Sequence, residues 1–207
     1  TALDATLSAD LSNVTVAAGG TLTGTFTASQ EFAGNFGTAG MTVSISDGAT
    51  MTVAANLVDG SDGPTLQKVG GSGTGIVAVR IGTADAAINM TSISSSGAAS
   101  TTFTVFENTT FTGTLASVAT GVANGVTLNL AAAKATGKTI TGTGSGSVIV
   151  TALDQTLNAD VSKVTVAAGG TVTGTFLTSG TFEGNFGTAG MTVSISDGAT
   201  MTVAANL

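Results

Sequence analysis

The chain has 207 residues, of which 42% are hydrophobic and 8% are charged, and its formal net charge is −7. Five basic residues scattered among twelve acids exclude the clustered cations that nucleic-acid binding requires. Because the sequence has no His and no Cys, Ser-His-Asp and Cys-His catalysis, disulfides and soft-metal sites are excluded as well.

The sequence at the beginning of the chain recurs, with few changes, at its end. Residues 1–57 and 151–207 are identical at 47 of these 57 positions, and Gly34–Leu57 returns without a change as Gly184–Leu207. We therefore divide the chain into residues 1–150, one full repeat period, and residues 151–207, the start of the next repeat, continuous with the first. Fainter similarity within the period indicates two half-units, at about 1–75 and about 76–150.

Short alternating patterns of apolar and polar residues, separated by Gly and Asp turns, follow one another along the chain. We expect short strands within Thr1–Val16, and further strands at Thr21–Thr27, Phe32–Phe36, Met41–Ser46, Met51–Leu57, Ile76–Ile81, Ile88–Ile93, Thr101–Phe106, Thr110–Leu115 and Val126–Leu130. Strands that return about every 8–11 residues, with no helical period between them, predict an all-β protein.

Two all-β architectures fit these strands. A β-solenoid (β-helix) built from tandem repeats has a thin core, which suits a chain rich in Ala, Val, Gly and Thr and without Trp or Tyr. The alternative is an array of small β-sandwich domains, one for each half-unit. Ser147–Val150 runs into Thr151–Leu153 without a linker, which favours the solenoid. We expect coils of about 20 residues, stacked about 4.8 Å apart.

Carboxylates are the remaining candidates for chemistry. Asp59 and Asp62 are weak Ca²⁺ candidates, because they offer hard oxygen ligands close together, although Asp and Gly are also ordinary turn residues. The run Gly70–Ile76 resembles the glycine-rich nonapeptide of calcium-stapled β-rolls, but Gly75 stands where that motif has its ligand Asp. Ca²⁺ is therefore the one cofactor that remains a candidate. The acids occur singly in turns, so we expect no enzyme.

Threonine rows and glycosylation sequons mark the expected outer surface. Thr21, Thr23, Thr25 and Thr27 alternate along one strand, and Thr110, Thr112 and Thr114 along another. Ice-binding solenoids use such rows, yet Thr is also a common outward residue of β-strands. The sequence Asn-x-Ser/Thr, the acceptor for N-glycosylation, begins at Asn13, Asn89 and Asn108.

Two longer segments carry a resemblance to a known class of repeat. Residues 125–142 and Leu153–Val166 resemble the Thr/Ala/Gly/Val-rich tandem repeats of very large bacterial surface and secreted proteins, adhesins among them. The resemblance is one of composition and style, so it implies an extracellular or cell-surface location and identifies no functional residue.

Together these features predict a structural and adhesive repeat segment of an extracellular rod, stalk or filament, stabilised by stacked β coils and able to assemble end to end by strand addition. The alternative is a surface module that binds a glycan, Ca²⁺ or ice. The expected partners are other copies or repeats of the chain and a surface glycan, and not nucleic acid. We expect no membrane span, since Thr, Ser and Gly interrupt every apolar run well before about 18 residues.

Overall fold

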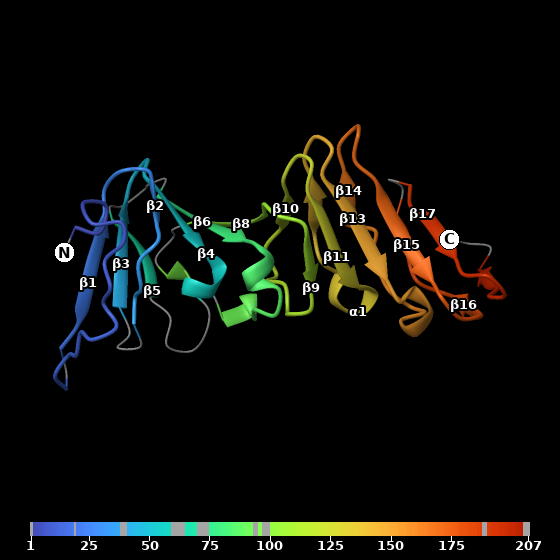
Figure 1. The fold of residues 1–207 in the computed structure, drawn as a ribbon, viewed down its shortest axis with the longest axis horizontal. Helices are drawn as coiled ribbons and strands as arrows, with labels where there is room; N and C mark the ends of the chain where they lie inside the picture. The colour runs from blue at the N-terminus through green and yellow to red at the C-terminus, as the bar shows by residue number, and fades with distance from the viewer. Residues whose placement is uncertain are drawn as a thin grey trace. The chain divides into compact units, whose positions relative to one another are not determined.

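The computed structural model of the chain describes residues 2–18, 20–37, 41–58, 65–69, 75–92, 95–96, 100–187 and 190–204. Its internal contacts divide the chain into two compact units, Thr1–Ile81 with Ile88–Phe103 and Gly82–Ala87 with Thr104–Leu207. In each unit, strands of one coil pair in parallel with strands of the next coil (Figure 1). Parallel stacking of successive coils defines a β-solenoid, and it differs from the antiparallel sheets of the β-sandwich alternative.

The first unit contains two stacks of parallel strands. One stack has the order β1–β3–β5–β7, and β2, β4 and β6 pair in the other. The strands are β1 (Leu22–Phe26), β2 (Gln30–Phe32), β3 (Met41–Ser46), β4 (Thr50–Ala54), β5 (Thr65–Val69), β6 (Ile76–Ile81) and β7 (Ser95–Ser96), with 3-10 turns at Ala55–Leu57 and Met90–Ser92. Leu22 pairs with Met41, whereas Thr50 pairs with the more distant Ile76, so the coils of this unit differ in length.

The second unit has a longer stack, in which β9, β11, β13, β15 and β17 lie side by side (Figure 1). β8 (Ser100–Val105) leads from the first unit into the second. The other strands are β9 (Thr109–Phe111), β10 (Thr120–Val122), β11 (Thr127–Ala131), β12 (Ile140–Gly142), β13 (Ser147–Thr151), β14 (Val164–Val166), β15 (Val172–Phe176), β16 (Gly180–Phe182), β17 (Thr192–Ile195) and β18 (Met201–Val203); the helical turns are α1 (Ala132–Ala135), Thr83–Asp85 and Leu153–Gln155. Thr109 pairs with Leu128, and Leu128 pairs with Val148, so these two steps are close to the expected coil length, whereas the step from Val148 to Val172 is longer.

The core of each unit consists of the inward side chains of these strands. On β3 the residues alternate between buried and half-buried positions, with Val43 and Ile45 fully buried. On β13, Val148 lies between Leu128 of β11 and Val172 of β15, so apolar residues form a ladder from coil to coil. Burial of each such side chain contributes about 1.5–3 kcal/mol relative to exposure, and this sum holds the thin core together.

The two sequence copies adopt the same local structure. Strands β1 to β4 recur as β15 to β18, one repeat period later in the chain. The rings of Phe32 and Phe36 stack with centroids 4.4 Å apart, and those of Phe182 and Phe186 stack at 4.2 Å. Isolated bridges likewise recur, joining Asp10 to Asn35 and Asp160 to Asn185. In these strands, bridges and rings, repetition in the sequence is therefore repetition in the structure.

One glycine of the repeat permits a close approach between coils. A Cβ atom at Gly34 would lie 2.2 Å from the carbonyl oxygen of Ala9, and one at Gly184 would lie 2.1 Å from that of Ala159. Both distances are far below van der Waals contact, so a larger residue would separate the coils. Next to each glycine, the amide of Asn35 or Asn185 donates to the same carbonyl at 2.9 Å.

Most expected strands are present, and some differ for identifiable reasons. Met41–Ser46 and Ile76–Ile81 are confirmed with their predicted bounds. The strand predicted at Ile88–Ile93 is wrong, because Met90–Ser92 forms a 3-10 turn there. Within Thr1–Val16 the described residues make isolated bridges instead of the predicted strands. The equivalent of its end in the second copy, Val164–Val166, is the strand β14, because β12 supplies a pairing partner.

Segments that are related by the fainter internal similarity also share their local conformation. Gly48 and Gly125 both have a positive φ, 76° and 75°, in the turns before β4 and β11. Each of these strands then leads directly into a single helical turn, the 3-10 turn Ala55–Leu57 after β4 and α1 after β11. The strand predicted at Met51–Leu57 ends at Ala54 for this reason.

The repeat offers a matched test of what coil stacking contributes to stability. Ile45 is fully buried, whereas its counterpart Ile195 is 44% exposed. We expect Ile45→Ala to lower the free energy of unfolding by about 2–5 kcal/mol, because it leaves a cavity between coils. Ile195→Ala should cost under about 1 kcal/mol. Urea unfolding at low protein concentration measures both, and equal losses would contradict the assigned burial.

Candidate functional site

The predicted Ca²⁺ ligands, Asp59 and Asp62, lie outside the described residues. Asp47, which precedes Gly48 in a tight turn nearby in the sequence, is exposed to solvent. Among the described residues, no group of three or more His, Cys, Asp or Glu side chains lies close enough to hold a metal ion. Ca²⁺ binding at Asp59 and Asp62 therefore stays a prediction.

Two pairs of equivalent acids form hydrogen bonds, and the first pair, Asp10 and Asp160, does so within turns. Asp10 Oδ1 accepts from the amide of Ser12 at 3.0 Å, and Asp160 Oδ1 accepts from the amide of Ser162 at 3.1 Å and from its hydroxyl at 2.6 Å. The pKa of each aspartate lies below its ordinary value, mainly because the hydroxyl of its serine donates to the carboxylate and secondly because the serine amide does so. A carboxylate that accepts these hydrogen bonds stabilises the turn, which is a structural role.

The second pair of acids joins successive coils, and here the repeat contains a compensated change. Asp4 Oδ2 accepts from the hydroxyl and the amide of Thr27. In the second copy the equivalent of Thr27 is Leu177, but the next residue, Thr178, donates its hydroxyl to Asp154 Oδ2 at 2.7 Å. The threonine hydroxyl is the main cause of the lowered pKa of each aspartate. The inter-coil bond thus survives although its donor has moved by one position.

The glycine-rich segments do not present a free phosphate cradle where they are described. Gly144 has a positive φ of 56° in the turn between β12 and β13. The amide of the following residue, Ser145, donates to Asn124 Oδ1 at 2.8 Å, so this turn is bonded to the turn of the preceding coil. In the other run, Gly75 is buried, and the rest of Gly70–Gly75 lies outside the described residues.

The threonine rows lie mainly on the outer face of the sheets. In the first unit, Thr23 and Thr25 of β1 are paired with Thr42 and Ser44 of β3. In the second unit, one row across the longer stack consists of Thr110, Asn129, Ile149, Thr173 and Thr192, each from the next strand. The predicted rows therefore run across the coils as well as along a strand. Thr112 is also exposed, and its hydroxyl donates to the carbonyl of Ala86 at 3.2 Å.

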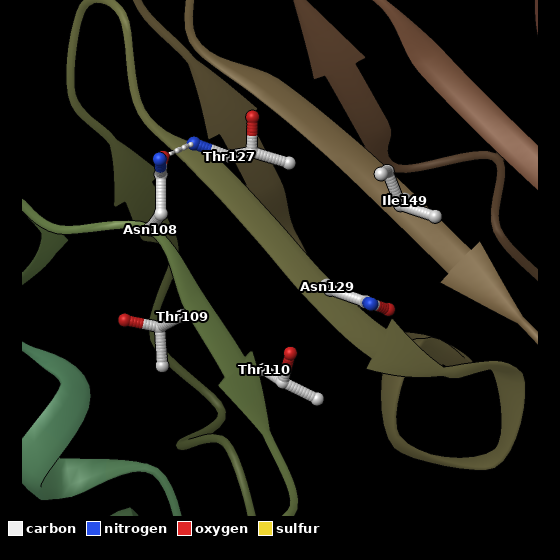
Figure 2. A pocket seen from close by; sticks show the side chains of 6 residues that line it. All are labelled: Asn108, Thr109, Thr110, Thr127, Asn129 and Ile149. Carbon is white, nitrogen blue, oxygen red and sulfur yellow. Dashed lines mark hydrogen bonds between the residues drawn. The ribbon is translucent and has the colours of Figure 1, made fainter.

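A shallow hollow of about 250 Å³ lies on this outer face (Figure 2). The side chains of Thr110, Asn129 and Ile149 project from β9, β11 and β13 along it, and Asn108 and Thr127 stand at one end. Asn108 Oδ1 accepts from the amide of Thr127 at 2.8 Å. The hollow offers amide and hydroxyl groups beside an aliphatic side chain, and no charged residue lines it. Such a surface could hydrogen-bond a neutral polar molecule.

The three sequon asparagines, Asn13, Asn89 and Asn108, are all exposed to solvent. Sequence reasoning identifies Asn108 as a sequon asparagine, but it does not find the hollow beside it. The signal that could have found it is the regular spacing of Thr110, Asn129 and Ile149, which pair with one another from strand to strand. A spacing of one coil places residues side by side on the outer face.

Comparisons with protein-family models, with curated proteins and with solved structures give no match to this chain. Within the part of the chain that the structure describes, none of the helices has the length and hydrophobicity that a membrane crossing requires. The functional argument therefore depends on the geometry of the solenoid itself.

The moved threonine gives a test by rescue. We expect Thr178→Ala to lower stability by about 0.5 kcal/mol at about pH 7, because Asp154 loses the threonine hydroxyl at an exposed position and keeps only its backbone donors. The double change Leu177→Thr with Thr178→Ala recreates the arrangement of Asp4 and Thr27, so it should restore most of this loss. Urea midpoints of the three proteins measure the effect, and failure of the double variant to recover would contradict it.

The same variants predict a pH dependence. Because the pKa of Asp154 in the folded chain lies below its ordinary value of 3.8, its hydrogen bond stabilises the fold above that pH. The contribution is lost as the pH falls through the lowered pKa. The difference between the original chain and Thr178→Ala should therefore shrink as the pH falls below 3.8 and disappear in acid that protonates Asp154. A difference that persists there would show that the loss does not depend on the carboxylate.

Proposed function

We propose that the chain is a structural and adhesive repeat segment of an extracellular rod, stalk or filament. The proposal assigns it no catalysed reaction. The observation that carries it is the repeated stacking of coils: β1 to β4 recur as β15 to β18, and the bridge from Asp10 to Asn35 and the stacked phenylalanine rings recur with them. A surface that is repeated almost verbatim suits a part whose length and regularity matter more than one reacting group. The location at the cell surface rests on the resemblance in composition.

Bonds between coils support a mechanical role. Besides the strand pairing, side chains of one coil accept hydrogen bonds from the backbone of the next. Ser29 Oγ accepts from the amide of Thr50 at 3.0 Å, and Ser179 Oγ accepts from the amide of Thr200 at 2.9 Å. Separating two coils therefore breaks several parallel hydrogen bonds and exposes apolar side chains at once. Cooperative loss of many small interactions is what makes stacked repeats resist extension.

Stretching a single molecule tests the mechanical role. With handles at both ends of the chain, we expect force peaks separated by multiples of about 70 Å, which is the extended length of a coil of about 20 residues. The expected peaks come from coils that unfold one or a few at a time. Extension without force peaks would contradict the proposed role. Rods or fibres in electron micrographs of the intact chain would support it further.

A second candidate function is a ligand-binding surface, and the hollow of Figure 2 favours a glycan as its ligand. Asn129 and Thr110 supply donors and acceptors that suit sugar hydroxyls, while Ile149 supplies an apolar patch. We propose that any adhesive contact with a glycan uses this outer face. Ice is a weaker candidate of the same class, because Asn129 and Ile149 interrupt the threonine row in the second unit. Ca²⁺ binding at Asp59 and Asp62 stays a prediction.

A glycan array with the intact chain, followed by calorimetry, tests this second candidate. We expect Asn129→Ala to weaken binding of any captured glycan by about tenfold or more, because it removes a bidentate polar group. Thr23→Ala is the matched control, since it changes an outer threonine far away in the sequence from the hollow. Calorimetry with Ca²⁺ serves the Ca²⁺ alternative. If the chain binds neither a glycan nor Ca²⁺, the mechanical role is the one candidate that remains.

A further inference from the structure

The ten positions that differ between the two copies are not spread evenly over the repeat. Seven of them fall in two short segments, residues 4–9 and 27–33 of the first copy, which correspond to residues 154–159 and 177–183 of the second. The changed pairs are Ala5 and Gln155, Ser8 and Asn158, Thr27 and Leu177, Ala28 and Thr178, Gln30 and Gly180, Glu31 and Thr181, and Ala33 and Glu183. These segments hold 13 of the 57 compared positions, so the changes are concentrated there.

The fold brings the two segments together in each copy. The amide of Ala33 donates to the carbonyl of Leu7 at 2.8 Å, and the amide of Glu183 donates to the carbonyl of Leu157 at 2.7 Å. The aspartate–threonine hydrogen bonds described above join the same segments. We call the two segments of a copy, taken together, its variable corner.

Exposure alone does not explain why the changes gather at this corner. All seven positions are exposed in the first copy, and in the second copy all except the half-buried Gly180 are exposed. Described coils follow the first copy and precede the second, so the exposure holds in both settings. Thr21, Asn35 and Asp47 are exposed as well, yet each is the same residue in both copies. In repeat folds, variation confined to one part of a constant scaffold is typical of the surface that binds a partner.

The compensated change at Asp154 separates scaffold from surface. Leu177 stands where the first copy has Thr27, and it is 53% exposed, more than any other large apolar side chain among the described residues. So exposed a leucine gains little from packing within the chain. Because Thr178 supplies the hydroxyl to Asp154, the inter-coil hydrogen bond is kept while an apolar side chain is presented to solvent.

A second exposed leucine belongs to the same corner. Leu157 is 37% exposed, and it lies beside Gly180, where an added Cβ atom would be 3.2 Å from its Cδ2. The first copy has Gln30 at the position of Gly180, so the second copy lacks a side chain there. Exposed polar residues of the same segments are Gln155, Asn158 and Thr181. Apolar groups at the centre and polar groups at the rim are the arrangement of a protein–protein interface.

The acids of the two corners differ in whether the chain itself neutralises them. Glu31 of the first copy forms an ion pair with Arg80 at 2.8 Å. Glu183 of the second copy is exposed, and within the described part of the chain it makes no such pair. The formal net charge of −7 adds to its negative field. A cationic group on the partner therefore complements this corner.

We propose that the variable corner of the second copy binds a protein partner through a segment that places an apolar side chain against Leu157 and Leu177 and a lysine or arginine beside Glu183. This inference rests on the proposed adhesive role and names its partner. The first copy has Thr27 in place of the exposed Leu177, and its acid is already paired, so the two corners differ in specificity.

The rescue variant Leu177→Thr with Thr178→Ala tests recognition separately from stability, because it removes the exposed leucine and keeps a threonine donor for Asp154. The intact chain serves to select from a library of random peptides displayed on phage, and the enriched peptides are synthesised and titrated by fluorescence anisotropy. We expect these peptides to carry an apolar residue next to Lys or Arg, and to bind the rescue variant about tenfold or more weakly.

Two further variants complete the test. Glu183→Gln should weaken binding by about threefold or more and reduce its dependence on salt, because it removes the charge and keeps the shape. Val118→Thr is the matched control, since Val118 is 48% exposed and lies outside the variable corner. It should bind the peptides like the unchanged chain. If circular dichroism shows that the rescue variant does not fold, Leu177→Gln, which leaves Thr178 in place, takes its role.

The proposal fails if no peptide is enriched, or if the enriched peptides bind the rescue variant as tightly as the unchanged chain. Enriched peptides without a cationic residue would overturn the assigned partner chemistry. Retention of the chain on phosphatidylcholine vesicles that is lost in the rescue variant would identify a lipid surface as the occupant instead. Force peaks on stretching, together with a failed selection, would leave the mechanical function standing while removing this interface.

Discussion

Parallel hydrogen bonding between one coil and the next is the constraint on which the rest of this structure depends. A strand with one face inward buries small and β-branched residues against its neighbours, but it does so fully only when coils lie on both sides. Val148, between Leu128 and Val172, has both neighbours and is completely buried. Ile195 has a described neighbour on one side and remains 44% exposed. The stability of this fold therefore comes from the contacts between neighbouring coils and not from a single coil by itself.

Much of the fold could be predicted because the same alternation of apolar and polar residues recurs along the sequence. Alternation along Met41–Ser46 and Ile76–Ile81 was sufficient to place β3 and β6, since both strands have one apolar face. Prediction was wrong at Ile88–Ile93, where apolar residues fall in a 3-10 turn and alternation carries no information about backbone curvature. Residues 14–16 and Val164–Val166 share their sequence pattern and differ in structure, so a partner strand decided the outcome.

The candidate sites were less accessible to sequence reasoning. Asp59 and Asp62 were chosen because acids close in sequence can share a cation, and they lie outside the described residues. The hollow beside Asn129 depends on residues about one coil apart, which become neighbours only once the coil length is known. The donor to the equivalent aspartate is Thr27 in the first copy and Thr178, one position later in the repeat, in the second copy. The sequence alone shows two unrelated substitutions there, and the structure of both copies is needed to see that the hydrogen bond is kept.

The central claim is that an identical sequence is held in place by the coils on either side of it. Hydrogen exchange of the backbone amides in Met41–Ser46 and in residues 191–196, measured in the monomer, tests this claim most directly. In β3, which pairs with β1 and β5, all the amides have strand partners on one side or the other. Alternate amides of β17 face an edge on which no described strand pairs, so these should exchange at least about 100-fold faster than their counterparts in β3. Equal protection of the two segments would contradict the account.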